Sequence, residues 1–156
     1  MVKKNYQVQK FRKAKTATAM MKNKPISLKY TNEIISNIKK GTVEKALGWL
    51  HRIENEEEFL PLRKYNKKVG HRKGESKGFS IIGRWPKRTV VVIIELLESV
   101  KANADYKGLD SENLFITHMF ASQGFHKNSN QSQGRIAGKR RKRKSTHVEI
   151  VVQEAR

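Results

Sequence analysis

The chain has 156 residues and carries 34 Lys and Arg against 14 Asp and Glu, which gives a formal net charge of +20 at pH 7. This length predicts one domain with one core, and the absence of cysteine excludes a disulfide scaffold and a cysteine-ligated zinc site. The longest apolar run, residues 90–94, is too short to cross a bilayer, and the amino-terminus lacks the apolar segment of a secretory signal, so we expect an intracellular protein with no membrane partner. A single Arg in residues 1–30 also disfavours a mitochondrial transit peptide.

The positive charge is concentrated in two acid-free segments. Residues 1–30 contain nine Lys and Arg, residues 121–147 contain eight, and neither segment contains Asp or Glu. The rest of the chain holds the other 17 basic residues together with all 14 acids, a net charge of only +3. Because like charges repel one another in a compact protein, this distribution predicts a polyanionic partner, and nucleic acid is the expected one.

The first part of the chain predicts a basic arm followed by two helices. Residues 1–25 are rich in Lys and show no sustained period, so we expect a basic amino-terminal extension there and one domain over residues 26–156. Alternation of apolar and polar residues over 26–30 predicts a short strand. Thr31 can cap a helix that ends at Gly41, and Thr42 can cap a second helix with apolar residues at helical spacing.

The middle of the chain predicts a basic loop and then a long helix. The acidic cluster at residues 54–58 favours a solvated helix end over a metal site. Residues 59–88 contain ten Lys and Arg and four glycines, which predicts a loop. Between Pro86 and Gly108, the apolar residues follow the helical period over about 20 positions, so we expect a helix despite the β-branched run at residues 90–94.

The last part of the chain predicts a long hairpin. Residues 114–120 and 147–152 both have strand-like composition, and the roughly 26 residues between them have almost no apolar content. Two arms that leave the domain together account for this segment. Because such a hairpin has no core of its own, we expect it to be ordered only against a partner.

Catalytic residues are hard to find in this sequence. The five His residues are scattered without metal-type spacing, and His118 and His147 fall in predicted strands, where packing is the favoured role. Residues 134–140 superficially resemble a phosphate-binding loop, but the segment is one residue short and lacks Ser or Thr after the Lys. We therefore expect no enzyme, no metal site and no cofactor.

Two patterns indicate nucleic-acid contacts. Residues 139–144 are six adjacent cations, which suit either a phosphate-binding patch or a nuclear-import signal. Residues 63–68 and 84–88 interleave Tyr65 and Trp85 with Lys and Arg, an arrangement in which rings can stack on bases while cations neutralise phosphates. For Trp85, a core position at the helix start is an equally good interpretation.

Several short motifs occur in the order of one known family. They are Arg63-Lys64-Tyr65-Asn66 with Val69-Gly70, Gly83-Arg84-Trp85-Pro86-Lys87, Leu97 followed by residues 99–105, Lys107-Gly108-Leu109, Gly134-Arg135-Ile136 and His147-Val148-Glu149-Ile150. Across residues 26–152 the chain resembles the L twenty-two family of large-subunit ribosomal proteins, called L seventeen in the eukaryotic cytosol. The Arg-Trp-Pro block resembles the archaeal and eukaryotic branch. The chain departs from the family at residues 128–133, which are uncharged where members carry basic residues.

The resemblance implies an α+β fold: three helices packed on a small antiparallel sheet, a long protruding β-hairpin at about residues 114–152, and an extended basic amino-terminal arm. It also implies a structural constituent of the large ribosomal subunit that binds large-subunit rRNA and neighbouring ribosomal proteins. Members help form the wall and mouth of the polypeptide exit tunnel, where they meet the nascent polypeptide. No reaction, cofactor or small-molecule substrate is implied. The implied location is the cytoplasmic ribosome, with assembly through the nucleus or nucleolus if the source is eukaryotic.

The candidate rRNA-binding residues come from the basic segments, the aromatic clusters and the family motifs. They are Lys10, Arg12, Lys13, Lys15, Lys22, Lys24, Arg63, Lys64, Tyr65, Asn66, Lys67, Lys68, Arg72, Lys73, Arg84, Trp85, Lys87, Arg88, Asn103, Arg135, Lys139, Arg140, Arg141, Lys142, Arg143 and Lys144. The hairpin tip that the resemblance places toward the tunnel comprises Lys127, Asn128, Ser129, Asn130, Gln131, Ser132 and Gln133.

Two alternatives come from other functional classes. A nuclear nucleic-acid-binding protein would use the basic run at residues 139–144, but it does not account for the ordered set of motifs. A nucleic-acid-processing enzyme would need clustered carboxylates to hold a metal ion, whereas the acids here fall on predicted helix surfaces.

Overall fold

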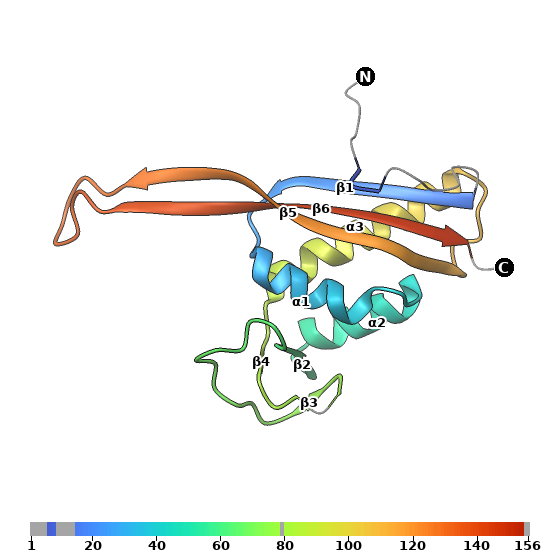
Figure 1. Ribbon diagram of the computed structural model, residues 1–156, viewed down its shortest axis with the longest axis horizontal. Helices are drawn as coiled ribbons and strands as arrows, with labels where there is room; N and C mark the ends of the chain where they lie inside the picture. The colour runs from blue at the N-terminus through green and yellow to red at the C-terminus, as the bar shows by residue number, and fades with distance from the viewer. Residues whose placement is uncertain (1–5, 9–14, 79, 155–156) are drawn as a thin grey trace, which may run out of the picture.

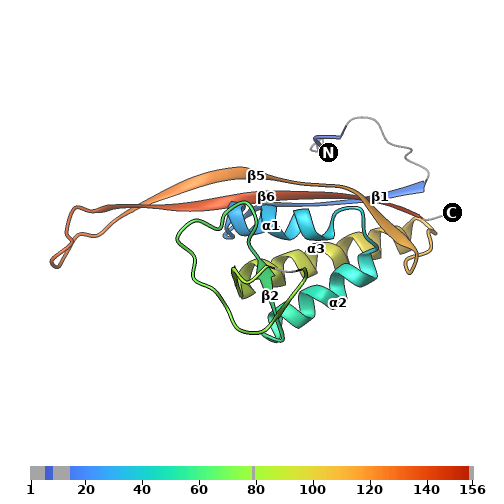
Figure 2. The same ribbon diagram turned by 60° about the horizontal axis from the view of Figure 1, so that its bottom comes forward.

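The computed structural model describes residues 6–8, 15–78 and 80–154. The elements in chain order are β1 (Thr16–Lys24), α1 (Leu28–Ile38), α2 (Val43–Glu54), β2 (Glu58–Pro61), β3 (Glu75–Ser76), β4 (Gly83–Arg84), α3 (Lys87–Tyr106), β5 (Leu114–Asn130) and β6 (Arg140–Glu154). Figures 1 and 2 show an elongated sheet of β1, β5 and β6 with the three helices on one face, and a hairpin end that extends beyond the helices. This confirms the predicted α+β fold and its protruding hairpin.

The main sheet is antiparallel, with strand order β1-β6-β5. Its inner face carries buried apolar side chains, among them Ala19 of β1, Ile150 of β6 and Met119 of β5, which are paired across the three strands. These side chains join the helices in one buried core. The outer face alternates with the inner one, as strand geometry requires, and carries Phe120 and Glu149.

The amino-terminal part of the chain differs from the sequence-based expectation. Residues 16–24, expected within an arm outside the core, form the edge strand β1, in which Ala17 and Ala19 are buried. Small side chains give little hydrophobic signal, and the apolar surface that covers them comes from β6 and α3, which lie far along the chain. Residues 1–5 and 9–14 of the predicted arm lie outside the described residues.

The strand expected at residues 26–30 is wrong. Helix α1 begins at Leu28 after the N-cap residue Ser27, and Thr31, expected as the cap, lies within the helix with its hydroxyl donating to the Ser27 carbonyl at 2.9 Å. The five-residue alternation was too short to separate a strand from the first turn of an amphipathic helix.

The other two helices match their predicted limits closely. Thr42 caps α2 by accepting a hydrogen bond from the Lys45 amide at 3.4 Å. Helix α3 begins directly after Pro86 and is followed by Gly108, whose φ of +70° suits a helix stop. None of the helices in the described part of the chain is long and apolar enough to cross a membrane.

The basic segment between β2 and α3 is an irregular loop crossed by short strands, so the prediction of a loop is confirmed in outline. Strand β2 pairs with β3 in parallel and with β4 in antiparallel fashion. At Gly83 of β4, a Cβ atom would collide with the Phe59 ring and would lie 2.6 Å from the Leu60 carbonyl oxygen. Only glycine fits this close crossing, which fixes the path of the chain into Trp85.

The hairpin pairs along nearly its whole length. The register runs from Leu114↔Glu154 to Asn130↔Arg140, with irregularities between Ile116 and His118 and between Gln123 and His126. The turn between the strands is held by backbone hydrogen bonds such as Gly138 to the Gln131 carbonyl at 2.8 Å. The expectation that a partner orders this hairpin stays a prediction.

Candidate nucleic-acid interface

The loop after β2 is folded around a buried carboxylate. Glu33 on α1 is 2% exposed, and its oxygens accept hydrogen bonds from the backbone amides of Lys64 and Tyr65, each at 2.8 Å, and of Arg63, at 3.3 Å. Three amides that converge on one charged group fix the loop backbone and leave the Arg63 and Lys64 side chains exposed. Nothing in the sequence distinguished Glu33, because a single acid on a predicted helix looks like a solvated residue.

Two lysine side chains lie over the ring of Tyr65 in the same loop. The Lys29 and Lys64 ammonium groups lie 5.6 and 5.8 Å from the centroid of its half-buried ring. This is within cation–π range and brings Lys29, which was not among the candidates, beside the predicted cluster. Lys67 and Lys68 continue the exposed basic surface of the loop.

Trp85 is covered on two sides by protein. Its ring makes an edge contact with Phe59 at 6.2 Å between centroids, and the Arg72 guanidinium lies 5.4 Å from the ring centroid. The half-buried ring therefore anchors the start of α3 and holds Arg72, which favours the core interpretation over base stacking.

The other basic candidates near the start of α3 differ in exposure. Lys73 and Arg88 are exposed, and Arg84 is half-buried. Lys87 forms an ion pair with Glu56 at 2.8 Å.

The candidates around β1 fall into different roles. Lys22 is exposed, and Lys24 forms an ion pair with Glu95 of α3 at 3.3 Å. Asn103 donates its side-chain amide to the Thr18 carbonyl at 3.0 Å, which ties α3 to the edge strand and favours a structural role. Lys15 is exposed, whereas Lys10, Arg12 and Lys13 lie outside the described residues.

Exposed cations are concentrated in the outer half of the hairpin. Residues 140–144 of β6 are all exposed, and Arg143 lies directly opposite Lys127 of β5. Among the described residues no ion pair involves residues 139–144. Like charges in directly opposed positions destabilise a hairpin unless counter-charges are supplied.

The predicted tip is divided between a strand and the turn. Lys127, Asn128, Ser129 and Asn130 belong to β5, while Gln131, Ser132 and Gln133 begin the turn that continues through Arg135 to Lys139. The end of the hairpin therefore combines the uncharged segment with Arg135, which is exposed.

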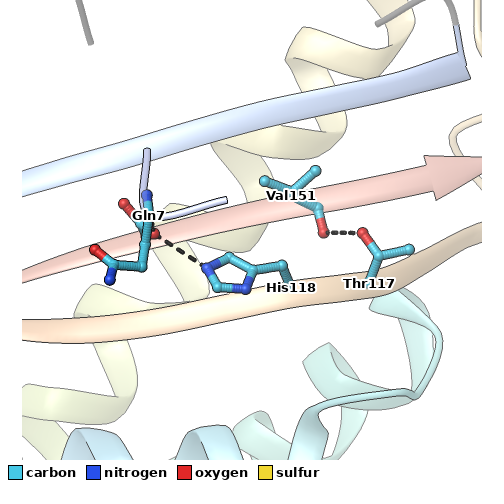
Figure 3. Close-up of polar contacts among 5 residues, drawn as sticks. Gln7, Thr117, His118 and Val151 are labelled. Carbon is cyan, nitrogen blue, oxygen red and sulfur yellow. Dashed lines mark hydrogen bonds and ion pairs between the residues drawn. The ribbon is translucent and has the colours of Figure 1, made fainter. Parts of the chain in front are cut away.

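The two histidines in the strands, His118 and His147, make polar contacts on the outer face of the sheet. His118 Nε2 lies 3.1 Å from a Glu149 carboxylate oxygen, which also accepts a hydrogen bond from the Gln7 amide at 2.9 Å. Figure 3 shows the His118 ring beside Gln7, and Thr117 bonded to the Val151 carbonyl on the neighbouring strand. His147 accepts a hydrogen bond from the Asn23 amide at 3.1 Å. Within the described residues, no group of three or more His, Asp or Glu is placed to hold a metal ion.

An α+β core, a basic hairpin that extends beyond it and, among the described residues, many exposed cations without acidic partners are typical of a ribosomal protein. The sequence matches the family model described as Ribosomal protein L22p/L17e over residues 19–153, and the chain belongs to this family of large-subunit ribosomal proteins. The match begins inside β1, in agreement with the role of that strand in the core sheet.

Curated relatives support the same family. The chain is similar to proteins named large ribosomal subunit protein uL22 from three archaea. It is 33% identical to that of Methanococcus aeolicus over 90% of both chains. It is 36% identical to that of Archaeoglobus fulgidus over 80% of this chain and 79% of the relative. It is 35% identical to that of Ignicoccus hospitalis over 90% of this chain and 89% of the relative. The family and the branch predicted from the motifs are confirmed.

Proposed function

We propose that this large-subunit ribosomal protein binds large-subunit rRNA through three basic surfaces and catalyses no reaction. The surfaces are the loop around Tyr65, the region of Arg72 and Arg88 at the start of α3, and the outer hairpin of residues 126–130 and 140–144. RNA shape rather than base sequence would set the specificity, because Lys and Arg reach phosphates more readily than base edges.

The main support for this proposal is that two cations, Lys127 and Arg143, lie opposite each other in the outer hairpin. Lys127 faces Arg143 in register, both residues are exposed, and among the described residues neither forms an ion pair. The protein alone does not offset their repulsion, whereas a phosphate backbone supplies negative charge along the whole arm.

The hairpin would help form the wall of the polypeptide exit tunnel and meet the nascent polypeptide there. Strand β6 has 15 residues and spans about 50 Å at roughly 3.3 Å per residue, and its outer end lies beyond the helices (Figure 2). This length lets the domain stay near the tunnel mouth while the turn reaches inward. The helical side would then face neighbouring ribosomal proteins and rRNA.

The proposed location follows from the family. Its archaeal relatives are ribosomal proteins, so we propose a ribosomal, cytoplasmic location without a membrane or small-molecule partner. The nuclear or nucleolar assembly step expected for a eukaryotic source finds no support in these relatives. The alternative of a nuclear nucleic-acid-binding protein rests on residues 139–144 alone, which the hairpin explains equally well.

Sedimentation of an epitope-tagged copy from the source cells tests the proposal. The tagged chain should travel with large subunits and polysomes, and it should leave them only at high salt or after ribonuclease treatment. A chain that stays in the free-protein or chromatin fraction would contradict the proposed function and favour the alternative.

A further inference from the structure

Phe125 is the most exposed phenylalanine among the described residues, with 75% of its surface accessible. It lies in β5 where the pairing with β6 changes register between Gln123 and His126. Such an irregularity leaves an unpaired residue and re-aims its side chain. Most of the Phe125 surface is therefore open to contact by a ligand.

The backbone of Phe125 is held from both sides by side chains. Its amide donates to Asn23 Oδ1 at 3.1 Å, and its carbonyl accepts a hydrogen bond from Ser145 Oγ at 2.8 Å. A Cβ atom on the neighbouring Gly124 would lie 2.5 Å from Ser145 Oγ and 2.6 Å from Asn23 Oδ1, so glycine is needed for this close approach. The ring is therefore presented from a fixed backbone rather than from a loose loop.

Cations line a hollow together with Phe125. Phe125 and Asn23 line two neighbouring hollows of about 370 and 400 Å³. The smaller hollow is also lined by Lys127, Arg143 and Lys144, and none of the described residues that line it is acidic. The larger one contains Glu149, but that carboxylate is already engaged by His118 and the Gln7 amide.

We propose that Phe125 is a stacking platform for one unpaired rRNA base, with Lys127 and Arg143 neutralising the adjacent phosphates. The inference rests on the proposed rRNA binding and adds a base contact to it. Aromatic rings take bases of any identity on their faces, and flanking cations follow the backbone of the same strand. An apolar protein partner fits less well, because it would bury Lys127 and Arg143 without counter-charges.

Binding of the full-length chain to a large-subunit rRNA transcript, measured with tRNA as competitor, tests the site. Phe125→Ala should weaken binding about 5- to 150-fold, the range for loss of one stacked base. Phe125→Leu should weaken it as well, because Leu has no π face, and Phe125→Trp should retain it. Phe115→Ala is the matched control, since Phe115 is a second exposed phenylalanine at the other end of β5, and it should bind as the parent does. All four variants should keep the parent's salt slope, because no charge is removed.

The outcomes separate the stacking site from the proposed function. A parent chain without salt-dependent binding to the transcript overturns the proposed function and the stacking site with it. A parent that binds, with Phe125→Ala unchanged, overturns the stacking site alone. Parent-level binding by Phe125→Leu would also overturn it, since apolar area would then suffice and a protein-docking surface would be indicated. Circular dichroism of each variant should match the parent, because the substituted rings are exposed.

Discussion

Removing the buried carboxylate of Glu33 should release the loop that carries Arg63 and Lys64. In Glu33→Gln, an oxygen in the Oε1 position retains the two 2.8 Å bonds to Lys64 and Tyr65, while the new amide group faces the Arg63 amide, donor against donor. One hydrogen bond to a charged group is lost, worth about 1.5–3 kcal/mol. In Glu33→Ala all three hydrogen bonds are lost. We expect a cost of about 3–5 kcal/mol, below a simple sum because water reaches a surface loop.

Thermal and denaturant unfolding measure these costs directly. For a domain of this size, the Gln variant should lower Tm by roughly 3–12 °C, and the Ala variant should lower it further. Amide exchange should accelerate at Arg63, Lys64 and Tyr65 before it changes in α3. Glu98→Gln is the control, since Glu98 is an exposed acid on α3 and its neutralisation changes the net charge equally.

RNA binding by the same variants tests the loop's proposed role. Both Glu33 variants should bind rRNA more weakly than Glu98→Gln, although each removes one negative charge and charge alone would strengthen binding. Unchanged stability and amide exchange in Glu33→Ala would show that Glu33 does not hold the loop in place. Normal RNA binding by a variant with a released loop would instead show that the loop's position does not matter for binding.

Three further predictions concern the hairpin and the core. If about six to ten cations meet phosphates, affinity for rRNA should fall by roughly 10³–10⁵ between about 50 and 200 mM salt, and a flat dependence would exclude backbone binding. In the free protein, amides of residues 126–130 and 140–144 should exchange much faster than those of residues 148–152, which pair within the core sheet; equal protection would show that the hairpin is stable without RNA. Asn128→Arg with Asn130→Arg should leave incorporation into subunits intact but slow cationic nascent segments, whereas deletion of residues 139–144 should impair assembly. Sedimentation and ribosome profiling distinguish these effects. The reverse pattern would show that residues 128–130, rather than residues 139–144, are needed for assembly.

The parts of the fold that could be predicted have signals within a single segment. Helix α3 has an apolar period of many turns, Pro86 at its start and Gly108 at its end, and these local features outweighed its β-branched run. Strand β1 lacked such a signal, because Ala17 and Ala19 become core residues only when β6 and α3 cover them. The first turn of α1 was ambiguous for a different reason, its short apolar pattern being shared by strand and helix.

The candidate interface was predicted as regions rather than as contacts. Charge runs located the basic loop and the outer hairpin, since segments with many more cations than acids are visible in the sequence alone. The roles of Glu33, Trp85 and Phe125 depend on residues that are distant in sequence and meet only after folding. A sequence pattern therefore could not show that Glu33 holds a loop, that Arg72 covers the Trp85 ring, or that Asn23 supports Phe125.

An electron cryomicroscopy map of the large subunit from the source cells tests the central claim most directly. We expect the helical domain of this chain at the tunnel mouth, residues 139–144 against rRNA phosphates, and the turn after Asn130 at the tunnel wall. A map in which the outer hairpin projects into solvent, away from rRNA, would contradict it.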